Sequence, residues 1–216
     1  KYPAGEVGKK KLYELFSKIK KSGKGKKYDC IIGVSGGTDS TYTLYLMKKM
    51  GLNPLAVHFD NGWNSDIAVK NIKNATNVLG IELYTLVADW EEFKDMQIAF
   101  LKSSTPDAEV PTDYAIISVL LKIAAKEKIK YIIEGQASRA EGTTPLGWTY
   151  HDGRYLRSIQ KKFGKLKSKS FPILSLFSLI YYFFVKRIKL ARPLEYIDYS
   201  KSMAKKVNIE KLNWTD

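Results

Sequence analysis

The sequence has almost no cysteine: Cys30 is the only one among 216 residues. A single thiol excludes an internal disulfide and a metal site built from several cysteines of this chain. Cys30 lies in a predicted strand, where a free thiol usually behaves as a small buried hydrophobe. A thiol in that place would point into the sheet, so we do not expect it to be a catalytic nucleophile.

Acidic residues are scarce relative to basic ones. The sequence has 22 Asp and Glu against 36 Lys and Arg, which gives a formal net charge of +14. Such a balance favours anionic partners, namely nucleic acid, a membrane surface or phosphorylated substrates. The densest lysine cluster lies at residues 18–27. We interpret this cluster as the end of a helix and a solvated linker rather than as a nucleic-acid-binding patch.

The sequence also lacks an apolar run long enough to cross a bilayer, which takes about 20 residues. Its longest run, at residues 171–185, is interpreted as a buried or interface helix. The basic residues that follow leave contact with a membrane surface as the alternative. A secretory signal is not visible, and we expect a cytoplasmic protein. Because the first residue is Lys1, the sequence looks like a fragment or a trimmed chain.

Apolar strands alternate with amphipathic helices over most of the chain. The pattern predicts strands at residues 28–33, 54–59, 82–87 and 130–134. It predicts helices at residues 8–22, 41–50, 68–79, 90–101 and 111–126. This alternation is typical of an α/β fold with a parallel, doubly wound sheet. We expect an N-terminal helix and linker at 1–27, the main domain at 28–157 and a helical C-terminal extension at 158–216.

A glycine-rich turn follows the first predicted strand. Residues 34–40 read Val-Ser-Gly-Gly-Thr-Asp-Ser and precede a predicted helix. Adjacent glycines let the backbone approach an anion, and the helix start adds N–H groups and the positive end of its dipole. The turn lacks the Gly-Lys-Ser/Thr of a Walker A loop and the spacing of the dinucleotide fingerprint. It resembles the PP-loop of the ATP pyrophosphatases, which cleave ATP to AMP and pyrophosphate.

This resemblance implies a doubly wound parallel sheet of the PP-loop (HUP-like) type, with ATP and Mg²⁺ as cofactors. The residues of this turn that are expected to bind the nucleotide are Gly33, Val34, Ser35, Gly36, Gly37, Thr38, Asp39 and Ser40. Asp39 would supply the carboxylate oxygen that Mg²⁺ prefers, and Asp39 and Ser40 are expected to be catalytic. The alternative is a Ser/Gly-rich turn in which Asp39 or Ser40 is an ordinary helix N-cap.

In a parallel sheet the carboxyl ends of the strands lie at one edge, and ligands bind there. We therefore expect two further strand ends beside this turn. The residues there that we expect to border the rest of ATP are Phe59, Asp60, Asn61, Gly135 and Gln136. Asn61 precedes a glycine, so a purely structural Asn-Gly turn is the alternative. Asp113, at the start of a predicted helix, is expected to be a second Mg²⁺ ligand and catalytic residue, with an N-cap role as the alternative.

Residues 135–155 show no helical or strand periodicity and begin at a predicted strand end. A long loop inside a compact domain is usually functional. The aromatic rings, carboxylates and arginines of this loop suit a sugar substrate. We expect substrate contacts from Arg139, Glu141, Gly142, Trp148 and Tyr150.

Four stretches narrow the resemblance. Residues 55–63, 110–113, 141–142 and 192–199 look like the N-acetyl sugar amidotransferases of surface-polysaccharide and nonulosonic-acid biosynthesis. This resemblance implies that ATP adenylates the acetamido carbonyl oxygen of a nucleotide-linked N-acetyl sugar and releases pyrophosphate. Ammonia then displaces AMP and leaves an acetamidino sugar for a surface glycan such as lipopolysaccharide.

The same resemblance implies partners. Ammonia would come from a glutaminase subunit with a cyclase-like barrel protein, and the apolar run at 171–185 is one expected docking surface. No nucleic acid and no transmembrane segment are expected, and a homodimer fits the resemblance. Similar proteins carry an upstream cysteine cluster that this sequence does not contain, so zinc is expected only in a segment preceding Lys1.

Two alternatives stay open at this point. The first is a PP-loop enzyme that modifies tRNA, thiolating or aminating a base after adenylation, and the positive charge of the chain supports it. The second is a nucleotide-binding regulatory domain without catalytic activity, because fold alone does not determine function.

Overall fold

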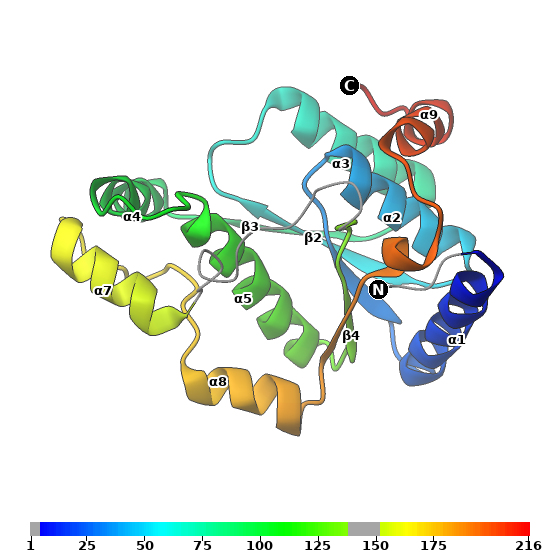
Figure 1. The fold of residues 1–216 in the computed structure, drawn as a ribbon, viewed down its shortest axis with the longest axis horizontal. Helices are drawn as coiled ribbons and strands as arrows, with labels where there is room; N and C mark the ends of the chain where they lie inside the picture. The colour runs from blue at the N-terminus through cyan, green and yellow to red at the C-terminus, as the bar shows by residue number, and fades with distance from the viewer. Residues whose placement is uncertain (1–4, 138–151) are drawn as a thin grey trace.

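The computed structural model describes residues 5–137 and 152–216 (Figure 1). Its centre is a five-stranded sheet with the order β3-β2-β1-β4-β5. The strands are β1 (Cys30–Gly33), β2 (Pro54–Asp60), β3 (Leu83–Val87), β4 (Tyr131–Ile133) and β5 (Lys189–Ala191). Every neighbouring pair is parallel. The expectation of an α/β fold with a parallel sheet is therefore confirmed.

Helices cover both faces of the sheet (Figure 1). The first five follow the sequence pattern closely: α1 (Gly5–Gly23), α2 (Thr38–Lys49), α3 (Asp66–Leu79), α4 (Trp90–Lys102) and α5 (Val110–Lys126). Three more α-helices lie in the C-terminal third of the described chain: α7 (Gly153–Phe163), α8 (Leu176–Ile180) and α9 (Lys201–Leu212). A π-helical turn, η2 (Tyr181–Val185), extends α8, and a 3-10 turn, η3 (Pro193–Tyr196), follows β5.

Alternate residues of the central strands contribute side chains to two separate hydrophobic cores. Ile31 and Ile132 face a core that α4, α5 and α7 close. Ile32 and Ile133, the next residues in each strand, face a second core that α1, α2, α3 and α9 close. Side chains of a strand alternate between the two faces of the sheet, and both faces here are covered. Because both faces are buried, the predicted strands are continuous apolar runs in the sequence.

Two carboxylates of α4 attach the segment that leads from α7 to α8. Glu92 accepts hydrogen bonds from the backbone N–H groups of residues 169–171, at 2.9–3.1 Å. Asp95 accepts from the N–H groups of Lys165 and Leu166. Burial raises the pKa of Glu92, but the hydrogen bonds from Ser170, Lys169 and Phe171 outweigh it and hold this pKa below its ordinary value. Both carboxylates are therefore held in the ionised form.

The apolar run at 171–185 is only partly buried. Its first half enters the core through Phe171 and Leu174. Its second half, α8 and η2, is largely exposed, with Phe177 at 82% and Phe184 at 76% exposed. The sequence predicts a buried or interface helix; the second half is not a buried helix, and an interface role for it stays a prediction. Within residues 5–137 and 152–216, no helix is long and apolar enough to span a membrane.

We predict that Leu121→Ala lowers the free energy of unfolding by about 2–5 kcal/mol, since this α5 side chain is fully buried. Leu101→Ala is the matched control, because Leu101 is 64% exposed on α4. Its cost should stay within about 0.5 kcal/mol. Urea denaturation followed by circular dichroism measures both values. Equal costs for the two substitutions would contradict this assignment of the core.

Candidate functional site

The glycine-rich turn between β1 and α2, residues 34–40, is here called the phosphate loop. Gly36 has a φ of +78°, a conformation that residues with a Cβ rarely adopt. A Cβ on Gly36 would lie 2.3 Å from the carbonyl oxygen of Ala68 in α3. Both the positive φ and the short distance to the Ala68 carbonyl oxygen therefore require glycine at this position. The loop is held closely against the start of α3.

Helix α2 begins at this loop without a side-chain cap. Its N-cap residue is Gly37, and within the described residues no side chain caps its first N–H groups. By contrast, α3, α4, α7 and α9 are capped by Ser65, Asp89, Asp152 and Ser200. Ser35 and Gly37 are exposed. The first turn of α2 therefore offers N–H donors and a positive dipole end to an external anion.

The two serines of the loop face each other. The Oγ atoms of Ser35 and Ser40 lie 3.1 Å apart, and the N–H of Ser35 donates to Ser40 Oγ at 3.2 Å. Ser40 Oγ in turn donates to the carbonyl oxygen of Gly37 at 3.3 Å. These contacts direct both hydroxyls into the loop. Hydroxyls in this place can donate to phosphate oxygens.

The end of β4 lies directly against the phosphate loop. A Cβ on Gly135 would lie 2.9 Å from the Cα atom of Ser40 and 3.1 Å from its nitrogen. The strand order reverses between β1 and β4, so this is the point at which a doubly wound sheet opens a crevice for a ligand. Gln136, the next residue, is exposed. The structure thus brings Gly135 and Gln136 together with the loop, as the sequence pattern predicts.

The side chains at the end of β2 shape their own turn. Asp60 Oδ1 accepts hydrogen bonds from Gly62 N at 3.0 Å and from Asn64 Nδ2 at 2.9 Å. Asn61 Oδ1 accepts from Trp63 N at 3.1 Å. Phe59 is buried and its ring packs edge-on against Phe93, 6.3 Å between centroids. A nucleotide would therefore meet the backbone of Phe59 rather than its ring.

The two expected Mg²⁺ ligands lie in the first turns of different helices. Asp39 is partly exposed in α2, and its carboxylate accepts a short hydrogen bond from the hydroxyl of Tyr199. Asp113 is exposed in the first turn of α5. The hydrogen bond from Asn61 Nδ2 to Thr112 Oγ1, at 3.4 Å, ties the start of α5 to the end of β2. The first turn of α5 therefore lies at the same edge of the sheet as the loop.

Two residues of the C-terminal segment contact the rear of the phosphate loop. The indole N–H of Trp214 donates to the carbonyl oxygen of Gly36 at 2.8 Å. The side-chain amide of Asn208 donates to the carbonyl oxygen of Thr38 at 2.9 Å. Sequence reasoning missed both residues, because neither belongs to a recognisable motif. The structure places them within hydrogen-bonding distance of the candidate site.

Several other expectations concern residues away from the loop. Cys30 is fully buried in β1, and burial raises the pKa of its thiol far above the ordinary value, with the Asp29 carboxylate adding to the effect. This agrees with the prediction that it is not a nucleophile. Within the described ranges, no group of three or more His, Cys, Asp or Glu side chains forms a metal cluster. The expected substrate residues lie outside the described residues: Arg139, Glu141, Gly142, Trp148 and Tyr150.

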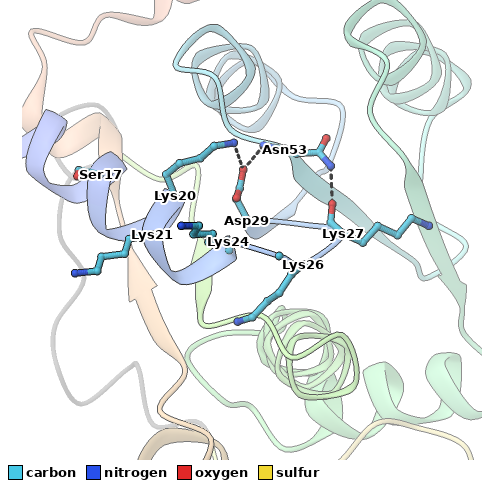
Figure 2. A pocket seen from close by; sticks show the side chains of 10 residues that line it. Ser17, Lys20, Lys21, Lys24, Lys26, Lys27, Asp29 and Asn53 are labelled. Atoms are coloured by element: carbon cyan, nitrogen blue, oxygen red, sulfur yellow. Dashed lines mark hydrogen bonds and ion pairs between the residues drawn. The ribbon is translucent and has the colours of Figure 1, made fainter.

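A lysine-rich hollow of about 590 Å³ lies where α1 ends and the chain enters β1, near the amino end of the strand and away from the phosphate loop (Figure 2). Lys20 pairs with the buried Asp29 at 2.9 Å, which fixes one wall. Burial lowers the pKa of Lys26, and the charge of Lys130 lowers it further. The residues that line this hollow are Ser17, Lys20, Lys21, Gly23, Lys24, Gly25, Lys26, Lys27, Asp29 and Asn53. Positive charge is thus concentrated in one concave place.

Comparison with known proteins identifies similar sequences. The family whose model matches is described as Queuosine biosynthesis protein QueC, and the match covers residues 29–139, just over half of the chain. An uncharacterized protein of Methanocaldococcus jannaschii is 34% identical over 138 residues, 62% of this chain and 47% of that protein. The tRNA(Ile)-lysidine synthase of Chlamydia pneumoniae is 37% identical over 71 residues, 31% of this chain and 22% of that enzyme. The chain thus spans about half or less of these two relatives.

A solved structure with a similar fold is that of the U34-tRNA thiolase NcsA from Methanococcus maripaludis. The TM-score is 0.50 at 15% sequence identity, and the likeness covers 98% of this chain and 67% of that one. At this identity the likeness concerns the fold alone. Together with the family match, it confirms the expectation of a PP-loop ATP pyrophosphatase fold.

These findings correct two expectations from the sequence. The sugar amidotransferase function is wrong, and so is the absence of a nucleic-acid partner, because the matched family and the tRNA(Ile)-lysidine synthase point to tRNA modification. The nucleotide sugar, the surface-glycan product and the glutaminase partner depended on the same resemblance. The physical reason is that a phosphate loop specifies only how ATP is held. The group that receives AMP is recognised by other residues.

We predict that Gly36→Ala abolishes pyrophosphate binding, because the added methyl group forces the loop away from Ala68. Gly51→Ala is the matched control, since Gly51 has a similar φ of +76° but a Cβ there meets open space. Both variants should lose stability from the left-handed backbone, and Gly36→Ala should lose more because its Cβ meets the Ala68 backbone. Isothermal titration with Mg²⁺-pyrophosphate should show binding only for the wild type and Gly51→Ala. Unchanged binding by Gly36→Ala would contradict the loop assignment.

Proposed function

Because the chain belongs to the QueC family, we propose that it is an ATP-dependent, AMP-forming enzyme that activates an oxygen atom of a tRNA base for replacement. The observation that carries the proposal is the family match over residues 29–139, which includes β1, the phosphate loop, the end of β2 and Gly135. Enzymes of the PP-loop superfamily are ligases and synthetases that use ATP. One relative with an assigned activity is a tRNA(Ile)-lysidine synthase.

The first step would be adenylation. An oxygen of the base attacks the α-phosphorus of ATP, and the bond from that phosphorus to the bridging oxygen of pyrophosphate breaks. Negative charge accumulates on the departing pyrophosphate. The uncapped N–H groups of α2 and the hydroxyls of Ser35 and Ser40 lie where they can stabilise this charge. Asp39 and Asp113 would hold Mg²⁺, which would offset negative charge on the phosphate groups.

The second step would be displacement of AMP. The adenylated oxygen is a good leaving group, so a nucleophile can attack the base carbon and expel AMP without a covalent enzyme intermediate. The only thiol of the chain is fully buried with a raised pKa, so it cannot carry sulfur to the base. This favours amination over thiolation. The protein would contribute mainly by aligning ATP and base, which supplies several kcal/mol of rate enhancement.

The lysine-rich hollow supports a polyanionic substrate. It gathers several ammonium groups in a concave surface, and burial, followed by the nearby charge of Lys130, lowers the pKa of Lys26. A bound phosphate group would relieve this repulsion. We assign the hollow to the sugar-phosphate backbone of a tRNA, at a part of the molecule distant from the reacting base. Contacts of this kind supply affinity that is independent of sequence and sensitive to salt.

We predict that the protein converts ATP to AMP and pyrophosphate when Mg²⁺, tRNA and ammonium ions or an amino acid are present. The expected product is a tRNA nucleoside in which nitrogen replaces oxygen. Chromatographic detection of AMP and pyrophosphate, with mass spectrometry of digested tRNA, measures both products. Asp39→Asn should lower turnover by roughly a hundredfold while the fold is retained, because Mg²⁺, which would offset the developing phosphate charge, loses a carboxylate ligand.

The control for this assay is Asp66→Asn. Asp66 lies in the first turn of α3 and is exposed, so this variant should react at the rate of the wild type. AMP formation at the same rate with and without tRNA would contradict the assignment of the substrate. Full activity of Asp39→Asn would contradict the assignment of the metal ligand.

We further predict that Lys21→Glu combined with Lys24→Glu weakens tRNA binding. The slope of the logarithm of the binding constant against the logarithm of the salt concentration should fall by the equivalent of about two phosphate contacts. The two side chains line the hollow. Lys10→Glu with Lys11→Glu is the control with the same charge change, on exposed positions of α1 away from the hollow. Filter binding at several salt concentrations measures the effect. Equal losses for the two pairs would mean that net charge, and not the hollow, attracts tRNA.

A further inference from the structure

The phosphate loop is held from behind by a segment that is distant in sequence. Trp214 Nε1 donates to Gly36 O at 2.8 Å across 178 positions, and Asn208 Nδ2 donates to Thr38 O at 2.9 Å across 170 positions. Trp214 is 6% exposed and Asn208 is fully buried. A carbonyl oxygen only accepts, so the amide nitrogen of Asn208 must face Thr38. The Trp214 bond is therefore buried and the Asn208 bond partly buried, and both have a fixed direction.

These bonds orient the donors on the opposite side of the loop. In a trans peptide the C=O of one residue and the N–H of the next point in opposite directions. When the Gly36 oxygen is held at the rear, the N–H of Gly37 faces forward. The bond to the Thr38 oxygen fixes the N–H of Asp39 in the same way. The C-terminal segment thus sets the direction of N–H groups that it does not itself touch.

The same segment also holds the expected metal ligand. The hydroxyl of Tyr199 donates to Asp39 Oδ1. The ring of Tyr199 packs against that of Tyr42 in α2, with centroids 5.8 Å apart and an interplanar angle of 46°. Tyr42 is largely buried, so the position of the Tyr199 hydroxyl is fixed by packing. One carboxylate oxygen of Asp39, Oδ1, is then engaged by Tyr199.

Two asparagines of α3 attach the end of the segment to the domain. Asn71 Nδ2 donates to Thr215 O at 2.7 Å, and Asn71 Oδ1 accepts from Thr215 N at 2.8 Å. Asn74 Nδ2 donates to Asn213 O at 2.7 Å. Asn71 Nδ2 also lies 3.4 Å from Gly36 O and adds a donor from α3 to the loop, whereas the bond of Asn74 is to Asn213 and not to the loop.

We propose that residues 199–215 are part of the nucleotide site, with Trp214 and Asn208 positioning the pyrophosphate-binding N–H groups and Tyr199 positioning Asp39 for Mg²⁺. This segment lies outside residues 29–139, the part that matches the QueC family. The inference rests on the ATP-binding half of the proposed function and is independent of which molecule receives AMP. None of the three side chains is assigned a chemical step.

The test is binding of pyrophosphate by the full-length protein, measured by isothermal titration with and without Mg²⁺. Trp214→Phe keeps an aromatic ring in place and removes only the N–H donor. Asn208→Leu keeps the volume and removes the amide. Each should weaken pyrophosphate binding by about three- to tenfold, with or without Mg²⁺, because a lost buried hydrogen bond frees the loop.

The matched control is Asn74→Ala. It loosens the same segment on α3 but leaves the bonds to Gly36 and Thr38 in place. Urea denaturation should show similar losses of stability for Asn74→Ala and Asn208→Leu, while only the second weakens pyrophosphate binding. If the two variants lose equal stability and bind equally well, the segment has a structural role only and the inference is overturned.

Tyr199→Phe distinguishes an effect on metal binding from an effect on phosphate binding. It should leave metal-free pyrophosphate binding unchanged and weaken Mg²⁺-pyrophosphate binding by about threefold or more, with recovery at high Mg²⁺ concentration. Tyr13→Phe, on an exposed position of α1, is the control. Equal weakening with and without Mg²⁺, or no change in either, would overturn the role given to Tyr199.

The two proposals fail in different ways. If the wild type and all variants bind pyrophosphate equally, the inference alone is overturned. If the wild type binds pyrophosphate but forms no AMP with tRNA, the proposed acceptor is wrong and the inference stands. If the wild type binds no pyrophosphate, both are overturned.

Discussion

The candidate site depends on the absence of side chains at two glycines. A Cβ on Gly135 would lie 2.9 Å from the Cα of Ser40, and a Cβ on Gly36 would lie 2.3 Å from the oxygen of Ala68. The phosphate loop is therefore in backbone contact with β4 on one side and with α3 on the other. The ends of β1, β2 and β4 lie at the same edge of the sheet as the loop. The uncapped start of α2 lies at this edge.

The part of the fold that could be predicted from sequence is the part with local signals. The apolar runs of β1 to β4 are continuous because both faces of the sheet are covered, and the helices between them show regular apolar positions. The phosphate loop was predictable for a similar reason, since its glycines and serines are adjacent in the sequence. The convergence of three strand ends followed from the parallel topology alone.

The features that could not be predicted from sequence depend on contacts between residues that are distant in the chain. Strand β5 has three residues, Lys-Leu-Ala, too few to show a period, and it exists because β4 offers a free edge. Trp214 and Asn208 matter through single hydrogen bonds to backbone atoms, which leave no pattern in sequence. The turn side chains of Asp60 and Asn61 proved to have local partners as well as a place at the strand end. The sugar substrate was predicted wrongly for a different reason. A loop that holds ATP carries no information about the molecule that receives AMP.

The long separation of the rear hydrogen bonds has a consequence for how the protein is made. Strands β1 to β4 and the loop leave the ribosome well before residues 208 and 214 are synthesised. Until then the Gly36 carbonyl oxygen has the Asn71 side chain of α3 as a donor, at 3.4 Å, but lacks Trp214, and the Thr38 carbonyl oxygen lacks Asn208. The nascent domain forms its sheet first. The two hydrogen bonds from Asn208 and Trp214 to the loop form only when the last helix docks.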